Sequence, residues 1–394
     1  MANRQVVVTA AVRAPIGKFG GSLKEIATVD LGAAVVRAAV VRAGIDAALI
    51  EQAFIGNVIH TDIRDMYLAR AVAITGGLAQ STPALTLNRV CGSGLQAIIS
   101  AAQAILLGDV DVALAGGVES MSRAPYWLPT MRWGQRMQNG AVIDPMAGAV
   151  TDPFNGCAMG VTAENVAKRY GITRLAQDEM ALASQQRAAT AIAAGYFDSQ
   201  IVPIDIPVKG GTTSFAVDEG VRGDSTLAGL AKLRPLFDAQ GSVTAGNSST
   251  INDGAAMLIL AEAEVARANG WPILARLVGY SHAGVDPDYM GIGPIPAIQQ
   301  LLKKTHIGSG EVAIYEINEA FAAQAAAVTQ ELGLDPATVN PNGSGISLGH
   351  PLGASGAILS VKAIYELQRT QHQYAVTSLC IGGGQGIAAM WARE

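Results

Sequence analysis

Cysteine, histidine and charged side chains are all scarce in this sequence of 394 residues. The three cysteines, Cys91, Cys157 and Cys380, are too few and odd in number for a disulfide framework, which indicates free thiols in a reducing compartment. Charged residues make up 15% of the chain and the net charge is −5, which excludes a general positive field for nucleic acid or an anionic membrane. No uninterrupted apolar run reaches the ~18 residues that span a bilayer. We therefore expect a cytoplasmic protein that binds neither nucleic acid nor membrane.

Apolar residues and glycine, by contrast, are abundant. Half of the residues are hydrophobic, which excludes a disordered chain and predicts a compact protein with large buried cores. At about 150 residues per domain, the length corresponds to two or three folding units. The 45 glycines follow no three-residue period, so they indicate tight turns between strands and helices rather than collagen.

The first 120 residues alternate β-branched runs with alanine-rich helical patterns, beginning with residues 6–12, 31–42, 53–59 and 66–75. The β-branched runs are too apolar to have a solvated face, so they predict a mostly parallel sheet with helices on both sides. This pattern breaks from residue 120 to about 250, where prolines, tryptophans and methionines cluster before a helical stretch. Structureless loops of that length are uncommon, so the segment predicts an insertion with helices of its own.

A weak internal duplication is visible when the turn elements of the two halves are compared. Three turn positions recur at similar spacings in the two halves: Asn57, Cys91 and Gly117 in the first half, and Asn318, His350 and Gly383 in the second. All of them follow apolar runs except His350, which follows the loop from Gly343 to Gly349. Two similar α/β halves with one insertion is therefore the predicted architecture.

Cys91 lies between a strand-like run and an apolar helical pattern, within residues 89–95. A thiol at this position meets the positive end of the helix, which favours the thiolate, the form that attacks a carbonyl carbon. The sequence thus predicts a nucleophile here, although a buried cysteine beside a tight turn would have the same pattern.

His350 lies in a glycine-rich stretch, residues 343–356. So many glycines indicate a backbone pressed against a ligand, and an imidazole of near-neutral pKa can accept the proton of a thiol. A structural histidine at a helix start is the alternative interpretation.

Cys380 ends an apolar strand pattern and is followed by glycines from Gly382 to Gly384. Such a loop can direct backbone N–H groups at a developing oxyanion while the thiol donates or accepts a proton. A phosphate-binding loop is the competing interpretation, but the lysine and hydroxyl of a Walker motif are missing. Asn318 stands at a strand-to-helix turn, where it is either a polar site residue or an ordinary helix cap.

Together these segments resemble the thiolase family, the acyl-CoA C-acyltransferases, and the resemblance extends over essentially the whole chain. Further matching segments are residues 116–122, 159–167 and 244–247. Within the family, the sequence is most similar to bacterial β-ketothiolases of broad short-chain specificity, including at residues 291–294 and 340–345.

The resemblance implies an α/β thiolase fold, in which two duplicated βαβαβαββ core domains form five layers, αβαβα, with an inserted loop domain. The implied boundaries are a first core domain over residues 1–120 and 250–272, an insertion for CoA and oligomer contacts over 121–249, and a second core domain over 273–394. The implied assembly is a homotetramer, built as a dimer of dimers.

The resemblance also implies a mechanism, with an acyl group carried on Cys91 and the thiol activated by His350. Cys380 removes the α-proton of acetyl-CoA in synthesis, or returns it in cleavage. His350 and a water held by Asn318 form one oxyanion hole, and the backbone N–H groups of Cys91 and Gly382 form the other. Splitting a Claisen step into two thioester transfers needs two such thiols and two such oxyanion holes.

The implied substrates are acetyl-CoA, acyl-CoA, 3-ketoacyl-CoA and CoA, with no cofactor and no metal, in fatty acid metabolism or polyhydroxyalkanoate synthesis. The positions implied to contact CoA are Met159, Arg222, Ala245, Ser249, Met290, Ala320 and Phe321. Arg222, Lys232 and Arg234 form a local basic cluster suited to nucleotide phosphates. Ala158 stands where many short-chain members have histidine, which predicts an acyl pocket that tolerates longer chains.

Three alternatives remain compatible with parts of the pattern. A strict acetoacetyl-CoA thiolase would differ only in its chain-length preference. A condensing ketoacyl synthase would ordinarily need a histidine where Asn318 stands. A non-catalytic CoA- or lipid-binding relative would lack one of the two thiols.

Overall fold

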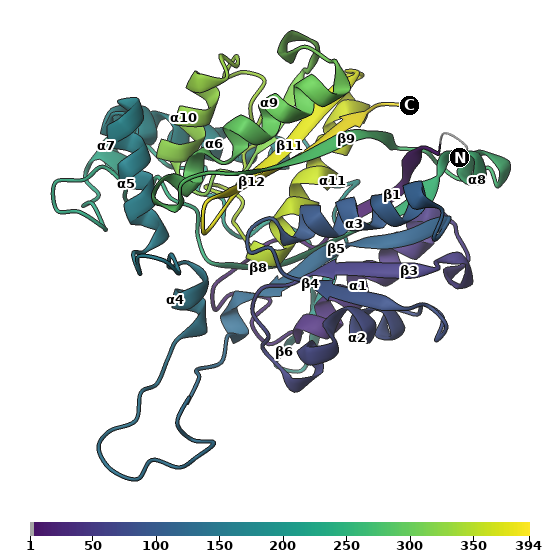
Figure 1. Ribbon diagram of the computed structural model, residues 1–394, viewed down its shortest axis with the longest axis horizontal. Helices are drawn as coiled ribbons and strands as arrows, with labels where there is room; N and C mark the ends of the chain where they lie inside the picture. Colours follow the sequence, from purple (N-terminus) through teal and green to yellow (C-terminus); the bar gives the residue numbers. More distant parts are fainter. Residues whose placement is uncertain (1–3) are drawn as a thin grey trace.

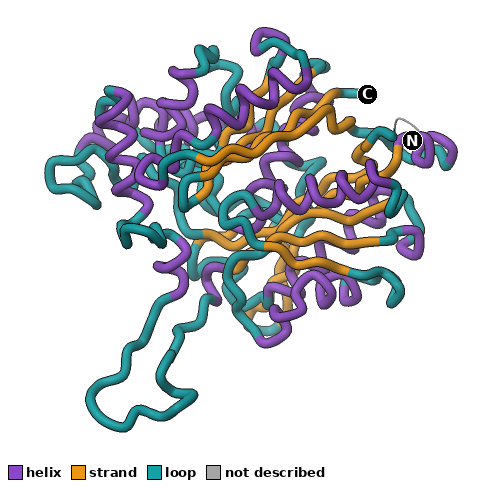
Figure 2. Tube along the Cα trace, in the orientation of Figure 1, coloured by secondary structure: helices purple, strands orange, loops and turns teal. Residues whose placement is uncertain are grey.

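The computed structural model describes residues 4–394, which fold into stacked layers of helix and sheet (Figures 1 and 2). The strands are β1 (Val6–Arg13), β2 (Gly17–Lys18), β3 (Gln52–Gly56), β4 (Ala84–Leu87), β5 (Val112–Ser120), β6 (Ile204–Val208), β7 (Gly211–Phe215), β8 (Asn252–Glu262), β9 (Ala275–Gly284), β10 (Ile314–Ile317), β11 (Tyr374–Ile381) and β12 (Gln385–Ala392). The α-helices are α1 (Thr28–Ala43), α2 (Leu68–Thr75), α3 (Ser93–Leu107), α4 (Pro145–Ala149), α5 (Met159–Tyr170), α6 (Arg174–Ala193), α7 (Leu227–Ala231), α8 (Ala263–Ala268), α9 (Pro294–Thr305), α10 (Ala322–Glu331) and α11 (Leu352–Thr370). The 3₁₀ helices are η1 (Ala47–Leu49), η2 (Ile63–Tyr67), η3 (Met121–Arg123), η4 (Pro287–Ile292) and η5 (Ser309–Glu311).

The main sheet consists of two halves that repeat one strand order. The first half runs β4, β3, β5, β8 and β1, and the second runs β10, β11, β12 and β9. The β3–β5 and β10–β11 pairs are parallel, and the next two pairs in each half are antiparallel. The predicted duplication is therefore confirmed. The expectation of a mostly parallel sheet is wrong, because strands buried on both faces are equally apolar whichever way they run.

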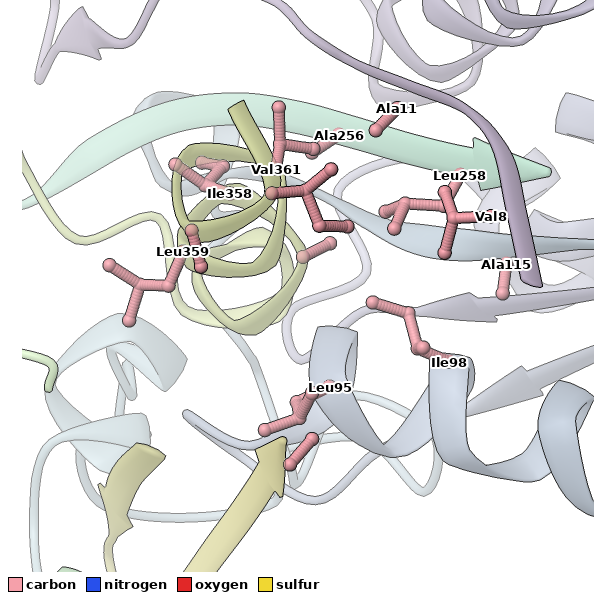
Figure 3. Close-up of a cluster of buried hydrophobic side chains, with 14 of the residues drawn as sticks. Val8, Ala11, Leu95, Ile98, Ala115, Ala256, Leu258, Ile358, Leu359 and Val361 are labelled. Atoms are coloured by element: carbon pink, nitrogen blue, oxygen red, sulfur yellow. The ribbon is translucent and has the colours of Figure 1, made fainter. Parts of the chain in front are cut away.

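Three hydrophobic clusters define five layers. The central cluster contains α3 and α11 between the two halves of the sheet, and Figure 3 shows Ile358 of α11 and Leu95 of α3 in it with Leu258 of β8. The outer face of the first half is covered by α1 and α2, and that of the second half by α9 and α10. Strand β1 supplies Val8 to the central cluster and Val7 to the outer one, so its continuous apolar run is buried on both faces.

Two glycines allow α3 and α11 to cross closely near their N-terminal ends. A Cβ atom at Gly94 would lie 2.8 Å from the Ala357 nitrogen, and one at Gly356 would lie 2.4 Å from the Leu95 nitrogen. A side chain at either position would force the helices apart. Because Cys91 comes just before α3 and the site histidine comes just before α11, this crossing brings the two candidate catalytic residues to one place.

The stretch Val90–Leu107, which includes α3, is long and apolar enough to cross a membrane, judged by length and composition only. Most of this stretch is buried inside the protein, where it belongs to the central cluster. Its hydropathy is that of a core helix.

Gly116 and Gly117 have a different role from the one that the duplication suggests. They do not end a strand as the Gly382–Gly384 turn does, because β5 continues to Ser120. A Cβ at Gly116 would lie 2.0 Å from the Ala256 oxygen, and one at Gly117 would lie 2.0 Å from the Gly353 oxygen. These glycines therefore serve the close packing of β5 against β8 and α11.

The segment 121–249 has helices of its own, as the sequence predicts: α4, α5, α6 and α7, together with the β6–β7 hairpin. Between η3 and α4 the chain forms a long arm that extends away from the body of the protein (Figures 1 and 2). The arm exposes large apolar side chains, including Trp127, Met131, Trp133 and Met137.

Candidate active site

A cavity of about 700 Å³ is lined by residues from both halves of the protein and from the segment 121–249. It contains every site residue predicted from the sequence except Asn318: Cys91, Met159, Arg222, Ala245, Ser249, Met290, Ala320, Phe321, His350, Cys380 and Gly382. Two thiols and one imidazole thus share a single, mainly apolar chamber, although they are separated by up to 289 positions in the sequence.

A strained turn presents Cys91 at the start of α3. Val90 has a φ of 46°, a left-handed conformation that is costly for a β-branched residue. The hydroxyl of Ser93 stabilises the turn, because it accepts a hydrogen bond from the Arg89 N–H at 2.8 Å and donates one to the Val90 carbonyl at 2.7 Å. The chain therefore turns sharply enough to place the thiol in the cavity.

The protonation of Cys91 differs from the sequence-based expectation. Burial raises the pKa of the Cys91 thiol to about 11, and the Glu119 carboxylate adds to the increase. The backbone N–H groups of Gly382 and of Cys91 itself act in the opposite direction by hydrogen bonding to the sulfur. The helix N-terminus is therefore outweighed by lost hydration, and the resting group is a thiol rather than the predicted thiolate.

His350 is held by its backbone as well as by its ring. Its N–H donates to the Asn252 Oδ1 at 2.9 Å, and Asn252 also donates to the Gly17 carbonyl at 2.9 Å. Burial lowers the pKa of the His350 imidazole to about 4, so the ring is neutral and can accept a proton.

The glycines around His350 face protein rather than a ligand, which corrects the sequence-based interpretation. A Cβ at Gly345 would lie 2.7 Å from the Glu319 oxygen, one at Gly349 would lie 2.5 Å from Asn252, and one at Gly353 would lie 2.6 Å from the Glu119 carboxylate. These contacts pack the loop and the start of α11 tightly against neighbouring strands, so they position the histidine.

Cys380 is the last residue but one of β11, and the glycine turn after the strand returns the chain into β12. Gly383 and Gly384 have φ values of 81° and 83°, which only glycine adopts without strain. Burial and the nearby Cys91 both raise the pKa of the Cys380 thiol. The second thiol is therefore also protonated at rest, while the Gly382 N–H lies against the sulfur of Cys91.

Asn318 lies outside the cavity but contacts its histidine. It follows β10, its N–H donates to the Ser378 carbonyl at 2.9 Å, and its side-chain nitrogen lies 3.3 Å from the His350 Nε2. Asn318 therefore acts on the cavity through its contact with the His350 ring.

The predicted CoA-contact residues form the walls of the cavity. Met159, Met290 and Ala320 pack with Cys380 in one buried apolar cluster. The ring of Phe321 meets that of Phe237 edge to face, with ring centroids 6.5 Å apart. Of the residues that the structure describes, those lining the cavity include Arg222 but neither Lys232 nor Arg234, so one member of the predicted basic cluster lines the cavity.

Sequence reasoning missed several lining residues, namely Lys18, Phe19, Val150, Leu236 and Phe237. For Lys18 and Phe19 a signal was present, since Gly17, Gly20 and Gly21 surround them in the sequence. The other three stand in segments with no distinctive pattern.

Buried charges fix the Lys18 segment against the segment that carries Arg222. Arg13 forms a fully buried, two-pronged ion pair with Asp218 at 2.7 and 2.8 Å. The neighbouring Glu219 accepts the Lys18 N–H at 2.8 Å. Lys18 and Arg222 consequently line the cavity from two backbone segments that these contacts hold together.

The fold and this site define the class of protein. The sequence matches the description "Thiolase, N-terminal domain" over residues 6–264 and "Thiolase, C-terminal domain" over residues 271–393. The chain belongs to the thiolase family, as its sequence predicted.

Among individual relatives, the chain is 56% identical to beta-ketothiolase BktB of Cupriavidus necator, over 99% of this chain and 100% of that protein. It is 47% identical to an acetyl-CoA acetyltransferase of Pseudomonas aeruginosa, over 99% and 100% of the two chains. The crystal structure of the Bacillus anthracis acetyl-CoA acetyltransferase superposes with a TM-score of 0.98 at 47% identity, with both chains fully covered. Human mitochondrial 3-ketoacyl-CoA thiolase in complex with CoA has a TM-score of 0.97 at 41% identity, covering 99% of this chain and 98% of the other.

These relatives confirm the thiolase fold and the assignment to acyl-CoA C-acyltransferases. The ketoacyl-synthase and non-catalytic alternatives are not favoured.

Proposed function

We propose that this acyltransferase condenses acetyl-CoA with an acyl-CoA, and cleaves 3-ketoacyl-CoA with CoA, through an acyl group carried on Cys91. The observation that supports this most is the presence of Cys91, Cys380 and His350 in one cavity. The acyl group must pass from acyl-CoA to the enzyme and then from the enzyme to the acetyl-CoA enolate. These two transfers require one thiol that carries the acyl group and a second group that moves the α-proton. The cavity contains both.

In the first step the sulfur of Cys91 attacks the thioester carbonyl while its proton passes to His350. The tetrahedral intermediate then expels the CoA thiolate, which takes the proton from His350. A thiol of pKa about 11 and an imidazole of pKa about 4 form a neutral pair at rest, so the proton moves only as the attack develops. His350 next takes the proton of the Cys380 thiol, and the resulting thiolate removes the α-proton of acetyl-CoA. The enolate then attacks the acyl carbonyl on Cys91 and expels the Cys91 thiolate, which takes the proton back from His350.

Two sets of donors are available for the negative oxygens of these steps. The N–H groups of Cys91 and Gly382, which lie against the Cys91 sulfur, are suited to one oxyanion. Protonated His350, with a water held by Asn318, is suited to the other.

We extend the proposal to the substrates, assembly and location. CoA and its thioesters are the only organic groups that the chemistry requires, with no further cofactor or metal. The apolar arm around Trp127 and Trp133 favours burial against other copies, in line with a homotetramer. A cytoplasmic location, and a role in fatty acid metabolism or polyhydroxyalkanoate synthesis, complete the proposal.

The acyl specificity is proposed to extend beyond four carbons because of Ala158. This residue pairs with Thr151 in a short antiparallel bridge, and the next residue, Met159, packs against Met290 and Cys380. An alanine here leaves room that an imidazole would fill, and an apolar pocket gains about 0.8 kcal/mol for each additional CH₂ it buries, about four-fold in kcat/KM.

A thiolysis series tests the function and its chain length together. We expect 3-ketovaleryl-CoA and 3-ketohexanoyl-CoA to be cleaved at least as efficiently as acetoacetyl-CoA, and Ala158→His to return the preference to four carbons. Ala147→His is the matched control, because Ala147 is exposed in the same segment away from the cavity. Unchanged ratios of kcat/KM in Ala158→His would refute the role of Ala158. Absence of thiolysis with every substrate would refute the function.

A further inference from the structure

The side-chain hydroxyl of Ser355 lies between His350 and the backbone of α11. Its Oγ is 2.6 Å from the His350 Nδ1 and 2.8 Å from the Pro351 carbonyl oxygen. A carbonyl oxygen only accepts, and a serine hydroxyl has one proton, so that proton is used on Pro351. Ser355 must therefore accept a hydrogen bond from His350, which places a proton on Nδ1.

A second contact is compatible with this protonation state. The side-chain amide nitrogen of Asn318 lies 3.3 Å from the His350 Nε2 and 3.5 Å from Nδ1, and an amide NH₂ group only donates. Because Nδ1 already donates to Ser355, Nε2 is the ring nitrogen left to accept. The neutral ring has one proton, so the Ser355 contact selects the tautomer with the proton on Nδ1 and a lone pair on Nε2, and the Asn318 contact agrees with it.

We propose that Ser355 is a positioning residue that holds His350 in the Nδ1–H tautomer, so that Nε2 is the nitrogen that takes the proton of Cys91. This inference rests on the proposed role of His350 as the base. The same lone pair, once protonated, becomes the N–H that stabilises an oxyanion. In the opposite tautomer Nε2 would already carry a proton and the lone pair would face Ser355.

The surroundings leave the ring little freedom to adopt another arrangement. His350, Ser355 and Asn318 are all at most 5% exposed. The N–H of Gly353, within the first turn of α11, donates to Glu119 at 2.7 Å, and this fixes the helix start from which Ser355 projects. The ring and its two partners are thus held by packing as well as by hydrogen bonds.

The test compares Ser355→Ala with Ser360→Ala. Ser360 is fully buried in the same helix and makes the same type of bond, from its hydroxyl to the Gly356 carbonyl at 2.8 Å, four residues earlier. We expect Ser355→Ala to lower kcat for thiolysis at least ~10-fold with little change in KM, because general base catalysis is impaired. Ser360→Ala should retain wild-type kcat, and Ser355→Thr, which keeps a hydroxyl, should recover most of it.

The tautomer itself is measured by NMR on enzyme labelled with ¹⁵N in the histidine rings, which is practicable for a chain with five histidines. A His350→Asn variant identifies the signals of His350. We expect a protonated Nδ1 and an unprotonated Nε2 in the wild type and in Ser360→Ala, and a mixture of tautomers in Ser355→Ala.

The proposal is overturned if wild-type His350 is protonated on Nε2, or if Ser355→Ala and Ser360→Ala lose kcat equally. The tautomer is read in the free enzyme, so this result stands apart from the proposed reaction. Failure of wild-type enzyme to form an acyl group on Cys91 would instead refute the proposed function. If Ser355→Ala does not fold, two measurements still test the proposal: the tautomer of His350 in the wild type, and kcat of Ser355→Thr, which should be close to that of the wild type.

Discussion

Lys362 and Glu316 form an ion pair inside the protein. Removing the lysine should lower the free energy of unfolding by an amount that depends on pH. The Lys362 Nζ lies 2.7 Å from a Glu316 carboxylate oxygen, with side chains 1% and 0% exposed. The same ammonium donates to the Gly343 carbonyl, at the start of the loop that carries His350. The other oxygen of Glu316 has no hydrogen-bond partner among the residues described. Lys362 is therefore the chief compensation for a buried carboxylate.

Replacing Lys362 with methionine leaves that carboxylate without its cation. Removing one partner of a buried ion pair typically costs about 3–5 kcal/mol of unfolding free energy, whereas removing both is often close to neutral. We therefore expect Lys362→Met to be strongly destabilised, and the double variant Lys362→Met/Glu316→Gln to recover most of the loss. Lys303→Met, at an exposed position of α9, is the control and should have wild-type stability.

The sign of the pH dependence follows from the carboxyl group. Burial raises the pKa of Glu316 to about 7 despite Lys362, so the folded protein binds this proton more tightly than the unfolded chain does. Folding stability from this group is thus present at low pH and is lost as pH rises through about 7. Without Lys362 the pKa rises further. The loss in Lys362→Met should therefore be larger at pH 8.5 than at pH 6, by up to about 1.4 kcal/mol per pH unit.

Denaturant unfolding at both pH values, monitored by circular dichroism, measures these differences, with equal protein concentrations because assembly affects stability. An equal loss in Lys362→Met at the two pH values would refute the electrostatic reasoning. A double variant as unstable as the single one would show that methionine fits the site poorly.

Three further predictions concern the cavity. Cys380→Ser should still acquire an acetyl group on Cys91 from acetyl-CoA, seen by mass spectrometry, but should lose condensation, because a hydroxyl exchanges the α-proton poorly near neutral pH. Loss of acylation in folded enzyme would contradict the roles assigned to the two thiols. Because the pKa of Cys91 is raised to about 11, its alkylation by iodoacetamide should accelerate about ten-fold per pH unit from pH 7 to 10, and a plateau below pH 8 would argue against this. Lys18→Gln should raise KM for acetyl-CoA by about two- to five-fold, as expected for the loss of an exposed ion pair with a phosphate, but should leave KM for acetyl-pantetheine unchanged. Lys24→Gln, at another exposed position, is the control. An equal effect of Lys18→Gln on both substrates would exclude a phosphate contact.

The sequence by itself determined which residues could carry the chemistry. Cys91 and His350 each precede an apolar helical pattern, and Cys380 precedes a glycine turn, so local patterns marked them as candidates and the resemblance to thiolases assigned their roles. The duplication was also visible, because an apolar strand followed by a turn residue is a short-range signal. All three residues line one cavity in the folded protein.

Only the tertiary structure decided the state of these groups and the part played by their neighbours. The helix start near Cys91 suggested a thiolate, but the thiol is protonated because hydration is lost to residues from distant parts of the chain. The glycines around His350 suggested a ligand, but they face Asn252, Glu119 and Leu95. Lys18 and Ser355 gained their places from contacts with Glu219 and His350. Burial and hydrogen bonding depend on which segments meet, and that information is absent from any single stretch of sequence.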